Sequence, residues 1–173
     1  AFPRLPVFAS AQELFKKVTP DIVVVATPDQ RHGSLVRLAA QHKTRLILCE
    51  KPLATTLRDG QSAIRACTRH GSLLLVNHMR RFDPLLARLQ RSVREGTFGK
   101  IQLARVLYVN GLLNGGTHAV DLLRWYLGDI AWVSAWKNPD AAFSHAGDYN
   151  ADAILQFKSG ARAVLQRNAA RIR

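Results

Sequence analysis

The sequence predicts an α/β protein, in which a parallel sheet of βαβ units precedes an α+β region with a mainly antiparallel sheet. Three short apolar runs support the first half of this prediction, at residues 22–26, 46–49 and 73–76. Segments with helical spacing of apolar residues separate these runs, as expected for parallel strands joined by right-handed crossovers. Because the runs are continuous rather than alternating, we expect the strands to be buried on both faces.

Helices are predicted wherever apolar residues recur at helical spacing, over residues 11–18, 31–41, 57–70 and 85–95. Ser10 stands before the first of these helices as its N-cap. Thr56, with Asp59 three residues later, opens the third. Gly71 closes the third helix, because glycine readily adopts the left-handed conformation that ends helices.

The sequence pattern changes near residue 97, where partly alternating apolar and polar residues replace the continuous runs. We therefore expect two domains, residues 1–96 and residues 97–173. Residues 101–109 have the partial alternation of a half-exposed antiparallel strand. Three more strands are predicted, over residues 131–136, 151–157 and 162–166. The last two are joined by a short Lys-Ser-Gly segment and predict a hairpin.

The second domain also contains a predicted helix, over residues 118–127. An Asn-Gly-Gly sequence at residues 114–116 predicts a turn before it, with Thr117 as the N-cap. Gly128 ends the helix. No internal repeat or low-complexity tract interrupts either domain.

The chain carries 25 basic and 12 acidic side chains, a net charge of +13, which makes a nucleic-acid-binding protein an alternative to consider. Its arginines are spread over helix faces that lie opposite apolar residues, so solvated helices explain them equally well. These arginines are Arg58, Arg65, Arg69, Arg88, Arg91 and Arg94. No aromatic-rich strand interleaves with them, as an RNA-stacking surface requires. We therefore expect no nucleic-acid partner.

No apolar run approaches the ~20 residues of a membrane span, and the first residues show no secretory signal. Cys49 and Cys67 fall in a predicted strand and a predicted helix. We therefore expect two buried thiols of a cytoplasmic protein rather than a disulfide framework. Neither a membrane partner nor a set of metal ligands is predicted.

Lys51 directly follows the second predicted strand, in the sequence Leu-Ile-Leu-Cys-Glu-Lys-Pro. In an open parallel sheet, ligands bind outside the carboxyl ends of the strands, so Lys51 is expected at the functional edge. Pro52 cannot donate a ladder hydrogen bond and ends the pairing there. Taken alone, Lys51 is explained more simply as a solvated lysine at a strand end.

Two further strand-end loops open on the same edge, at residues 27–32 and 77–83. Each of their polar residues has a simple structural explanation. Asp29 can cap a helix, and Arg80 and Arg81 can be solvated. Their shared location is what favours a functional interpretation.

His118 and Asp121 stand three residues apart and therefore share one face of their predicted helix. Taken as an isolated pair, they are explained more simply as structural residues. A lysine at a facing sheet edge makes a lysine–histidine acid–base site the functional alternative. Histidine titrates near neutral pH and can accept a hydroxyl proton, while a lysine ammonium stabilises a developing alkoxide.

Four motifs occur in order along the chain: Thr27-Pro28 with His32, Glu50-Lys51-Pro52-Leu53-Ala54, Met79-Arg80-Arg81-Phe82-Asp83-Pro84, and Gly116-Thr117-His118 with Asp121 and Gly128. With this series, the chain resembles the Gfo/Idh/MocA family of nicotinamide-dependent oxidoreductases over about residues 7 to 166. The resemblance implies a Rossmann domain that binds NAD or NADP, followed by an α+β domain with an open, mainly antiparallel sheet. It also implies oxidation or reduction of a sugar, a polyol or a related carbonyl compound.

The resemblance further implies roles for single residues. Lys51 and His118 would be catalytic, with His118 taking the hydroxyl proton and Lys51 contacting both ribose and substrate. The cofactor contacts would be Thr27, Pro28, His32, Glu50, Lys51 and Arg81, and the substrate contacts would be Arg80, Asn114 and Asp121. Family members often pair through the outer face of the second sheet, which implies a homo-oligomer.

The chain departs from the family pattern at two points. Asn114 occupies a position where many members carry aspartate, and an amide cannot accept a proton at neutral pH, which shifts proton transfer onto His118 and Lys51. No G-x-G-x-x-G sequence occurs, so we expect a partial Rossmann sheet without the first βαβ unit and its phosphate loop. A truncated, non-catalytic relative that acts as a binding or assembly module is therefore the alternative function. The substrate, and the choice between NAD and NADP, stay open.

Overall fold

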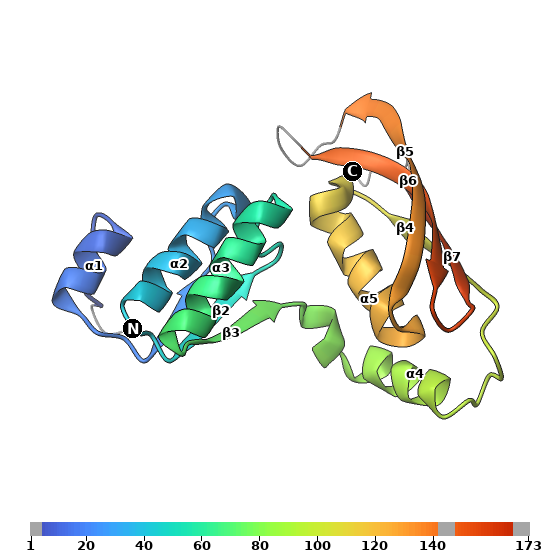
Figure 1. Ribbon diagram of the computed structural model, residues 1–173, viewed down its shortest axis with the longest axis horizontal. Coiled ribbons are helices and arrows are strands. Elements are labelled where there is room, and N and C mark those ends of the chain that lie inside the picture. The colour runs from blue at the N-terminus through green and yellow to red at the C-terminus, as the bar shows by residue number, and fades with distance from the viewer. Residues whose placement is uncertain (1–4, 142–147, 168–173) are drawn as a thin grey trace. The chain divides into compact units, whose positions relative to one another are not determined.

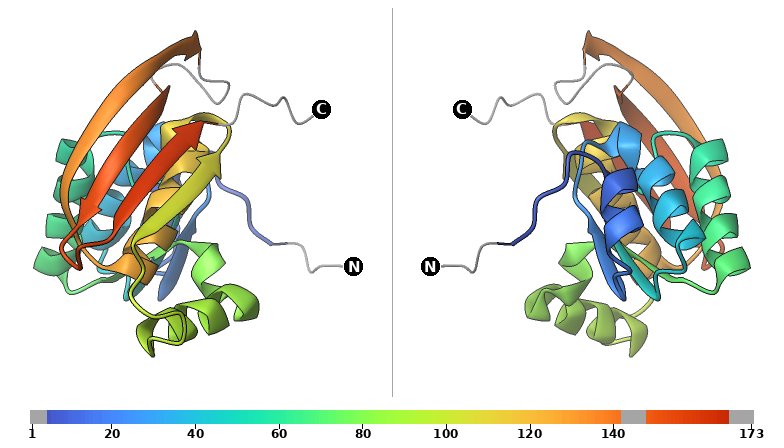
Figure 2. Two further views of the ribbon diagram at one scale, coloured as in Figure 1. Left: turned by 90° about the vertical axis from the view of Figure 1, so that its right-hand side faces the viewer. Right: turned by 90° about the vertical axis from the view of Figure 1, so that its left-hand side faces the viewer.

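The computed structural model describes residues 5–141 and 148–167 of the chain (Figure 1, Figure 2). Contacts divide the chain into two compact units, Ala1–Asn77 and His78–Arg173. Each unit has a sheet and an apolar core of its own. No helix in the described ranges is long and apolar enough to cross a membrane.

The first unit contains a three-stranded parallel sheet in the order β1-β2-β3. Its strands are β1 (Ile22–Val25), β2 (Leu46–Glu50) and β3 (Leu73–Asn77), and its helices are α1 (Ala11–Lys17), α2 (His32–Gln41) and α3 (Leu57–His70). In the centre of the sheet, Ile47 of β2 lies between Val23 of β1 and Leu74 of β3. The alternation of strands and helices confirms the predicted βαβ order.

Helices α2 and α3 cover one face of this sheet (Figure 1). Ile47 and Cys49 belong to that face and are fully buried. On the other face, Ile22, Val24 and Leu73 are 60%, 62% and 60% exposed. The expectation that the strands are buried on both faces is therefore wrong for β1 and β3, whereas Leu46 and Leu48 of the central strand β2 are partly buried. A continuous apolar run shows that both faces are suited to burial, but it does not show what covers them.

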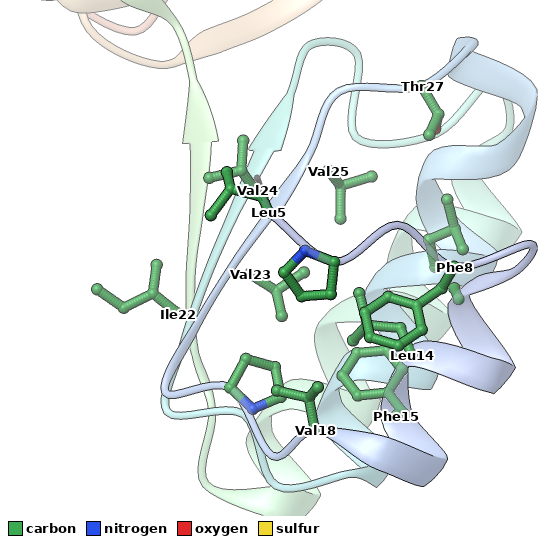
Figure 3. A pocket seen from close by; sticks show the side chains of 14 residues that line it. Leu5, Phe8, Leu14, Phe15, Val18, Ile22, Val23, Val24, Val25 and Thr27 are labelled. Carbon is green, nitrogen blue, oxygen red and sulfur yellow. The ribbon is translucent and has the colours of Figure 1, made fainter. Parts of the chain in front are cut away.

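Strand β1 lies at the edge of the sheet, and the described residues pair it with β2 alone. A cavity of about 670 Å³ opens beside it, between β1, helix α1 and the segment that precedes α1 (Figure 3). The lining is almost wholly apolar and includes Leu5, Phe8, Leu14, Phe15, Val23 and Val25. None of the lining residues is a cation, so the cavity is suited to an apolar surface rather than to a phosphate group.

The helix ends of the first unit form as predicted. Ser10 Oγ accepts a hydrogen bond from the Glu13 backbone N–H at 3.1 Å, and Thr56 Oγ1 accepts one from the Asp59 N–H at 3.2 Å. Gly71 ends α3 with φ of 72°, in the left-handed conformation. These local signals therefore fix where two of the helices begin and where α3 stops.

Both cysteines are free and buried in the core of the first unit, as predicted. Cys49 lies in β2 and Cys67 lies in α3. Burial raises the pKa of the Cys49 thiol to about 12, and it also raises the pKa of Cys67.

The second unit contains a four-stranded sheet in the order β4-β7-β6-β5. Its strands are β4 (Leu103–Tyr108), β5 (Ile130–Ala141), β6 (Tyr149–Phe157) and β7 (Arg162–Arg167), and its helices are α4 (Pro84–Arg94) and α5 (Thr117–Leu127). Strands β6 and β7 form the predicted hairpin, and β5 also pairs antiparallel with β6. The predicted α+β character and mainly antiparallel pairing are confirmed.

Strand β4 differs from the prediction, because it pairs with β7 in the parallel direction. The chain leaves β4 through helix α5 rather than through a tight turn, so β4 does not have to run against its neighbour. The partial alternation of residues 101–109 indicates that one face is covered, and it carries no information about strand direction. The sheet is therefore mixed, with one parallel pair at its edge.

Helix α5 covers the inner face of this sheet, where Leu123 packs with Leu155, Phe157 and Leu165. The left view of Figure 2 shows the opposite, outer face of the sheet. Large apolar side chains on this outer face are exposed to solvent: Leu103, Leu107, Trp132 and Trp136. An exposed apolar face of this kind is typical of an interaction surface.

Helix α4 belongs to the second unit, since Tyr126 Oη on α5 donates a hydrogen bond to the Leu86 carbonyl oxygen on α4 at 3.3 Å. The contacts divide the chain after Asn77, whereas the change in sequence pattern places the domain boundary at residues 96 and 97. The change in pattern marks where strands become half-exposed. Helix α4 precedes that point in the sequence, although it packs with α5.

Candidate active site

The strand-end loops of the first unit carry several of the candidate site residues. Because β1, β2 and β3 are parallel, their carboxyl ends lie at one edge of the sheet. Glu50 and Asn77 are paired in the register there, and Asn77 Nδ2 donates a hydrogen bond to Glu50 Oε1 at 2.6 Å. The last residue of β3 thus holds the carboxylate at the end of β2 in place.

Lys51 lies directly after Glu50, in the loop between β2 and α3. Its side chain is half-buried. The structure therefore places a cationic side chain at the strand edge where parallel sheets bind their ligands, as the sequence predicts.

Thr27 and Pro28 form the exposed loop after β1. Thr27 Oγ1 donates a hydrogen bond to the Pro28 carbonyl oxygen at 3.4 Å. Pro28 precedes a short 3-10 helix, Asp29–Arg31, which leads into α2. Both side chains lie on the surface at the same sheet edge as Lys51.

His32 lies beneath these loops and is only 2% exposed. Its Nδ1 is 2.6 Å from the carbonyl oxygen of Pro52, and its Nε2 is 2.8 Å from that of Thr27. A neutral imidazole donates to one of these carbonyls, and a protonated one donates to both. Both ring nitrogens therefore face the protein backbone, which differs from the cofactor contact implied by the family resemblance. His32 joins the loops that follow β1 and β2.

The second unit contains a group of neighbouring side chains that we call the histidine cluster: His78, Arg81, His118, Asp121 and Trp125. The first two come from the segment that contains the short 3-10 helix Met79–Phe82, and the other three come from α5. Positions 118, 121 and 125 lie three or four residues apart and so share one face of α5. The helical repeat therefore brings the cluster together.

Arg81 and Asp121 form a bidentate ion pair within this cluster. Arg81 Nε donates hydrogen bonds to Asp121 Oδ1 and Oδ2 at 3.1 and 2.9 Å, and Nη2 donates to Oδ1 at 2.7 Å. The guanidinium also lies 5.6 Å from the ring centre of Trp125. The hydrogen bond to Asp121 raises the pKa of Arg81. Arg81 and Asp121 therefore bind each other in the structure. The family resemblance implies instead that Arg81 contacts the cofactor and Asp121 contacts the substrate.

His78 is a member of the cluster that the sequence motifs do not single out. Its Nδ1 lies 3.8 Å from Asp121 Oδ2. Its ring also meets the ring of His118 edge to face, with centroids 6.4 Å apart and planes at 88°. The signal that could have found His78 is its position directly after β3, in one of the loops expected at the site.

The segment before α5 differs from the predicted turn and cap. Residues Gly111–Gly116 form a π-helical segment that continues into α5. Thr117 Oγ1 donates a hydrogen bond back to the Asn114 carbonyl oxygen at 2.8 Å, rather than accepting one from the helix end. A Cβ atom on Gly115 would collide with the Val109 carbonyl oxygen, so this glycine allows two backbone segments to approach closely. Such π-helical insertions are frequent at functional sites.

Arg80 and Asn114 complete the predicted substrate contacts. Arg80 is exposed and lines a small cavity of about 120 Å³ together with Gly115 and Ala119. Asn114 lies in the π-helical segment. The two residues are therefore placed on different elements of the second unit.

A larger cavity, of about 330 Å³, opens beside the histidine cluster. Its polar lining comes from His78, Thr117, Asp121 and Arg124, and its apolar lining comes from Leu112, Leu113 and Val120. A mainly apolar wall with a few polar groups is typical of small-molecule sites. Within residues 5–141 and 148–167, no group of three His, Cys, Asp or Glu residues could hold a metal ion.

Two family models match these two parts of the chain. The model described as an oxidoreductase family with an NAD-binding Rossmann fold matches residues 1–78, and the model of the GFO/IDH/MocA C-terminal domain matches residues 109–171. The chain belongs to the Gfo/Idh/MocA family. The predicted family is thereby confirmed, and both the parallel sheet and the mixed sheet fall within matched regions.

Curated relatives of this chain include two that are named as dehydrogenases of a sugar and of a polyol. A D-apiose dehydrogenase from Paraburkholderia graminis is 30% identical over 84% of this chain and 43% of its own length. An inositol 2-dehydrogenase from Saccharopolyspora erythraea is 35% identical over 62% of this chain and 35% of its own length. The chain thus spans half or less of the length of these relatives.

Solved Gfo/Idh/MocA structures share the fold. The WlbA dehydrogenase from Bordetella pertussis, in complex with NADH and UDP-GlcNAcA, has a TM-score of 0.82 and 26% identity, covering 91% of this chain and 54% of its own. A probable dehydrogenase from Thermotoga maritima has a TM-score of 0.79 and 27% identity, covering 95% of this chain and 55% of its own.

The residues of this chain fit part of a nicotinamide dinucleotide. The strand-end loops offer exposed Thr27 and a fixed Glu50 carboxylate, which can hydrogen-bond to ribose hydroxyls. The pyrophosphate of a dinucleotide binds at a glycine-rich loop that opens a helix, and the sequence contains no G-x-G-x-x-G. The strand-end loops therefore carry side chains that are chemically able to bind a ribose, while the sequence shown contains no G-x-G-x-x-G loop.

Proposed function

We propose that this chain forms part of an NAD(P)-linked oxidoreductase that interconverts a hydroxyl and a carbonyl group on a sugar, polyol or related compound. The observation that carries the proposal is the position of Lys51 in a Gfo/Idh/MocA chain, directly after β2 at the carboxyl edge of the parallel sheet. D-Apiose and inositol, from the names of two relatives, indicate the class of substrate to test first.

His118 is the acid–base residue of this proposal. An imidazole titrates near neutral pH and can accept the proton of a substrate hydroxyl without further adjustment. Asn114 can hydrogen-bond to that hydroxyl but cannot take its proton. When bound, the nicotinamide supplies the hydride acceptor or donor.

Lys51 is the electrostatic partner of this step. Its ammonium stabilises negative charge on the substrate oxygen as the hydroxyl proton leaves. On the cofactor side, Thr27, Pro28 and Glu50 are assigned to the nicotinamide ribose, with Glu50 oriented by Asn77. His32 and Arg81 are assigned supporting roles instead, because their polar atoms already contact other parts of the protein.

Cofactor binding tests the proposal directly. NADH and NADPH are titrated into the chain and their fluorescence is followed. Saturable binding that is weakened at least tenfold in Lys51→Ala, and left unchanged in a control variant of an exposed lysine on α1, Lys16→Ala, supports the assignment. If neither cofactor binds, the alternative of a non-catalytic binding or assembly module is favoured for this chain.

Activity is then measured with a panel of polyols and sugars that includes myo-inositol and D-apiose, through the absorbance of the reduced nicotinamide. We expect His118→Asn to lower kcat by about 10²–10⁴, the usual range for loss of a general acid–base group. An unchanged kcat in this variant would remove His118 from the mechanism.

A second copy of the chain is the proposed partner, bound through the outer face of the second sheet. Trp132 and Trp136 are 51% and 56% exposed on this face. Analytical ultracentrifugation of Trp132→Lys tests the proposal, because a buried ammonium at a subunit interface strongly disfavours association. The control is Val24→Lys, which places the same charge on the exposed face of the first sheet. Dissociation by Val24→Lys alone would place the interface elsewhere.

A further inference from the structure

His78 lies close to an acidic group and to the histidine assigned to proton transfer. On one side, its Nδ1 is 3.8 Å from Asp121 Oδ2, and the Asp121 side chain is only 12% exposed. On the other side, its ring stands edge to face with the ring of His118, at a centroid distance of 6.4 Å. The His78 imidazole thus lies close both to the Asp121 carboxylate and to the His118 ring.

The carboxylate that faces His78 is held in a fixed orientation. Three hydrogen bonds from Arg81 fix Asp121, and the guanidinium is itself placed over Trp125. A carboxylate fixed in this way cannot turn away when His78 changes its protonation state. The group facing His78 is therefore constant while the imidazole titrates.

Several charged or titratable groups surround His78 in the second unit. They come from α5, from the 3-10 segment that follows His78 and from the lining of the adjacent cavity. These groups are His118, Asp121, Arg124, Arg80 and Arg81. Asp121 is the one anion among these five. Its single negative charge is already paired with Arg81. It therefore favours a state in which the two histidines hold one proton between them over a state in which each histidine holds a proton.

Two imidazoles at this distance titrate as a pair, because a proton on one raises the cost of a proton on the other. The first proton goes to the ring beside the carboxylate, since an opposite charge within about 4–6 Å favours the charged form. That ring is His78. His118 then keeps the neutral form, which is the form that can accept a proton from a hydroxyl.

We propose that His78 is a positioning residue for His118, orienting its ring by the edge-to-face contact and keeping it neutral by holding the first proton opposite Asp121. The catalytic purpose of this arrangement rests on the proposed function. The coupling of the two rings does not, because all the groups involved belong to the second unit of the chain itself.

The coupling is measured by NMR on the chain with ¹⁵N-labelled histidine, in the absence of cofactor and substrate. We expect the His118 ring in His78→Phe to titrate in one step, with a midpoint raised by about 0.5–1 pH unit. Phenylalanine keeps an aromatic ring against His118 and cannot hold a proton, so this variant separates orientation from charge. His70→Asn, which removes a histidine from the end of α3, is the control and leaves the His118 midpoint unchanged.

A second variant keeps the test valid if His78→Phe does not fold. Asp121→Asn removes the carboxylate, and the His78 midpoint is then expected to fall while the His118 midpoint rises. Midpoints for His118 that stay within about 0.2 pH unit in the folded variants overturn the proposal.

Enzyme assays separate this proposal from the proposed function. In an active enzyme preparation, we expect His78→Phe to shift the acidic limb of the pH profile of kcat/KM to higher pH by about 0.5–1 unit. At pH values above that limb, kcat should remain at the wild-type level. A shift in the NMR titration without any cofactor binding would favour the non-catalytic alternative for this chain and leave the coupled pair established. A catalytically active chain without the NMR shift would refute the coupled pair alone.

Discussion

His32 and Pro52 are joined by a contact of 2.6 Å between the imidazole Nδ1 and the Pro52 carbonyl oxygen. The same ring reaches the Thr27 carbonyl oxygen at 2.8 Å through its Nε2. One buried side chain at the start of α2 therefore ties together the loops that follow β1 and β2. The position of the loop that carries Lys51 depends on this ring rather than on strand pairing alone.

We expect His32→Phe to lower the free energy of unfolding by about 1–3 kcal/mol, because the Thr27 and Pro52 carbonyl groups, which are partly buried at these contacts, lose their partner. Urea unfolding followed by circular dichroism measures this change. His70→Phe, at the half-buried end of α3, is the matched control and should have little effect. Equal stability of His32→Phe and the wild type would show that water replaces the imidazole at both carbonyls.

Gly33 permits the close packing of α2 against α3. A Cβ atom at this position would overlap the carboxylate of Asp59, which also forms an ion pair with Arg37 of α2. We expect Gly33→Ala to lower the free energy of unfolding by about 1–3 kcal/mol, as overpacking does. Gly60→Ala is the control, because its Cβ would meet only Ala54 Cβ at 3.8 Å. In a helix interior this second change should raise stability, by up to about 1 kcal/mol.

Cys49 should make stability fall at high pH. Burial raises the pKa of its thiol from 9.0 to about 12 in the folded chain. Above pH 9.0 the unfolded chain loses this proton while the folded chain keeps it, so the free energy of unfolding decreases as pH rises toward about 12. Urea unfolding of wild type and Cys49→Ala across this range measures the difference. The variant should show a shallower decline, and an equal slope would mean that the thiolate is tolerated in the core.

Arg81→Lys tests the geometry of the ion pair with Asp121. Lysine keeps the positive charge but cannot form the bidentate hydrogen bonds, so we expect thermal unfolding to occur at a lower temperature, with a loss of about 1 kcal/mol. Arg124→Lys is the control, because Arg124 makes one hydrogen bond, at 2.9 Å, to Asp129 and both side chains are more than half exposed. Equal effects in the two variants would show that charge alone stabilises the Arg81 pair.

The helices and strands follow from local patterns in the sequence. Thr56 and Gly71 mark the two ends of α3, and the apolar centre of β2 is evident from Leu46 to Cys49. Long-range choices do not follow from such patterns. Whether β4 runs parallel or antiparallel depends on β7, which lies far away in the sequence. Likewise, the exposure of Val24 depends on what packs against the sheet and not on the strand itself.

The sequence predicts which residues lie at the candidate site, but it does not predict which of their side chains contact each other. Strand ends identify Lys51 and Glu50 because parallel strands deliver their carboxyl ends to one edge. The sequence gives no sign that Arg81 binds Asp121, since the two residues are 40 positions apart. His32 is a similar case: a histidine in the first turn of a helix can face either solvent or protein, and only the fold places it under the loops.

Among the described residues, no strand pairs with β1 on the side away from β2, which has a consequence for the isolated chain. Unpaired backbone amides and carbonyls along a strand can recruit an extended segment from any source, including the same strand of another molecule. In this chain, the unpaired backbone groups belong to the valine-rich strand β1 and lie beside the apolar cavity. We therefore expect concentrated solutions to aggregate through β1 while the second sheet is still folded. Hydrogen–deuterium exchange at the backbone amides of Ile22–Val25 tests this expectation, because amides that pair with another strand exchange more slowly than unpaired ones.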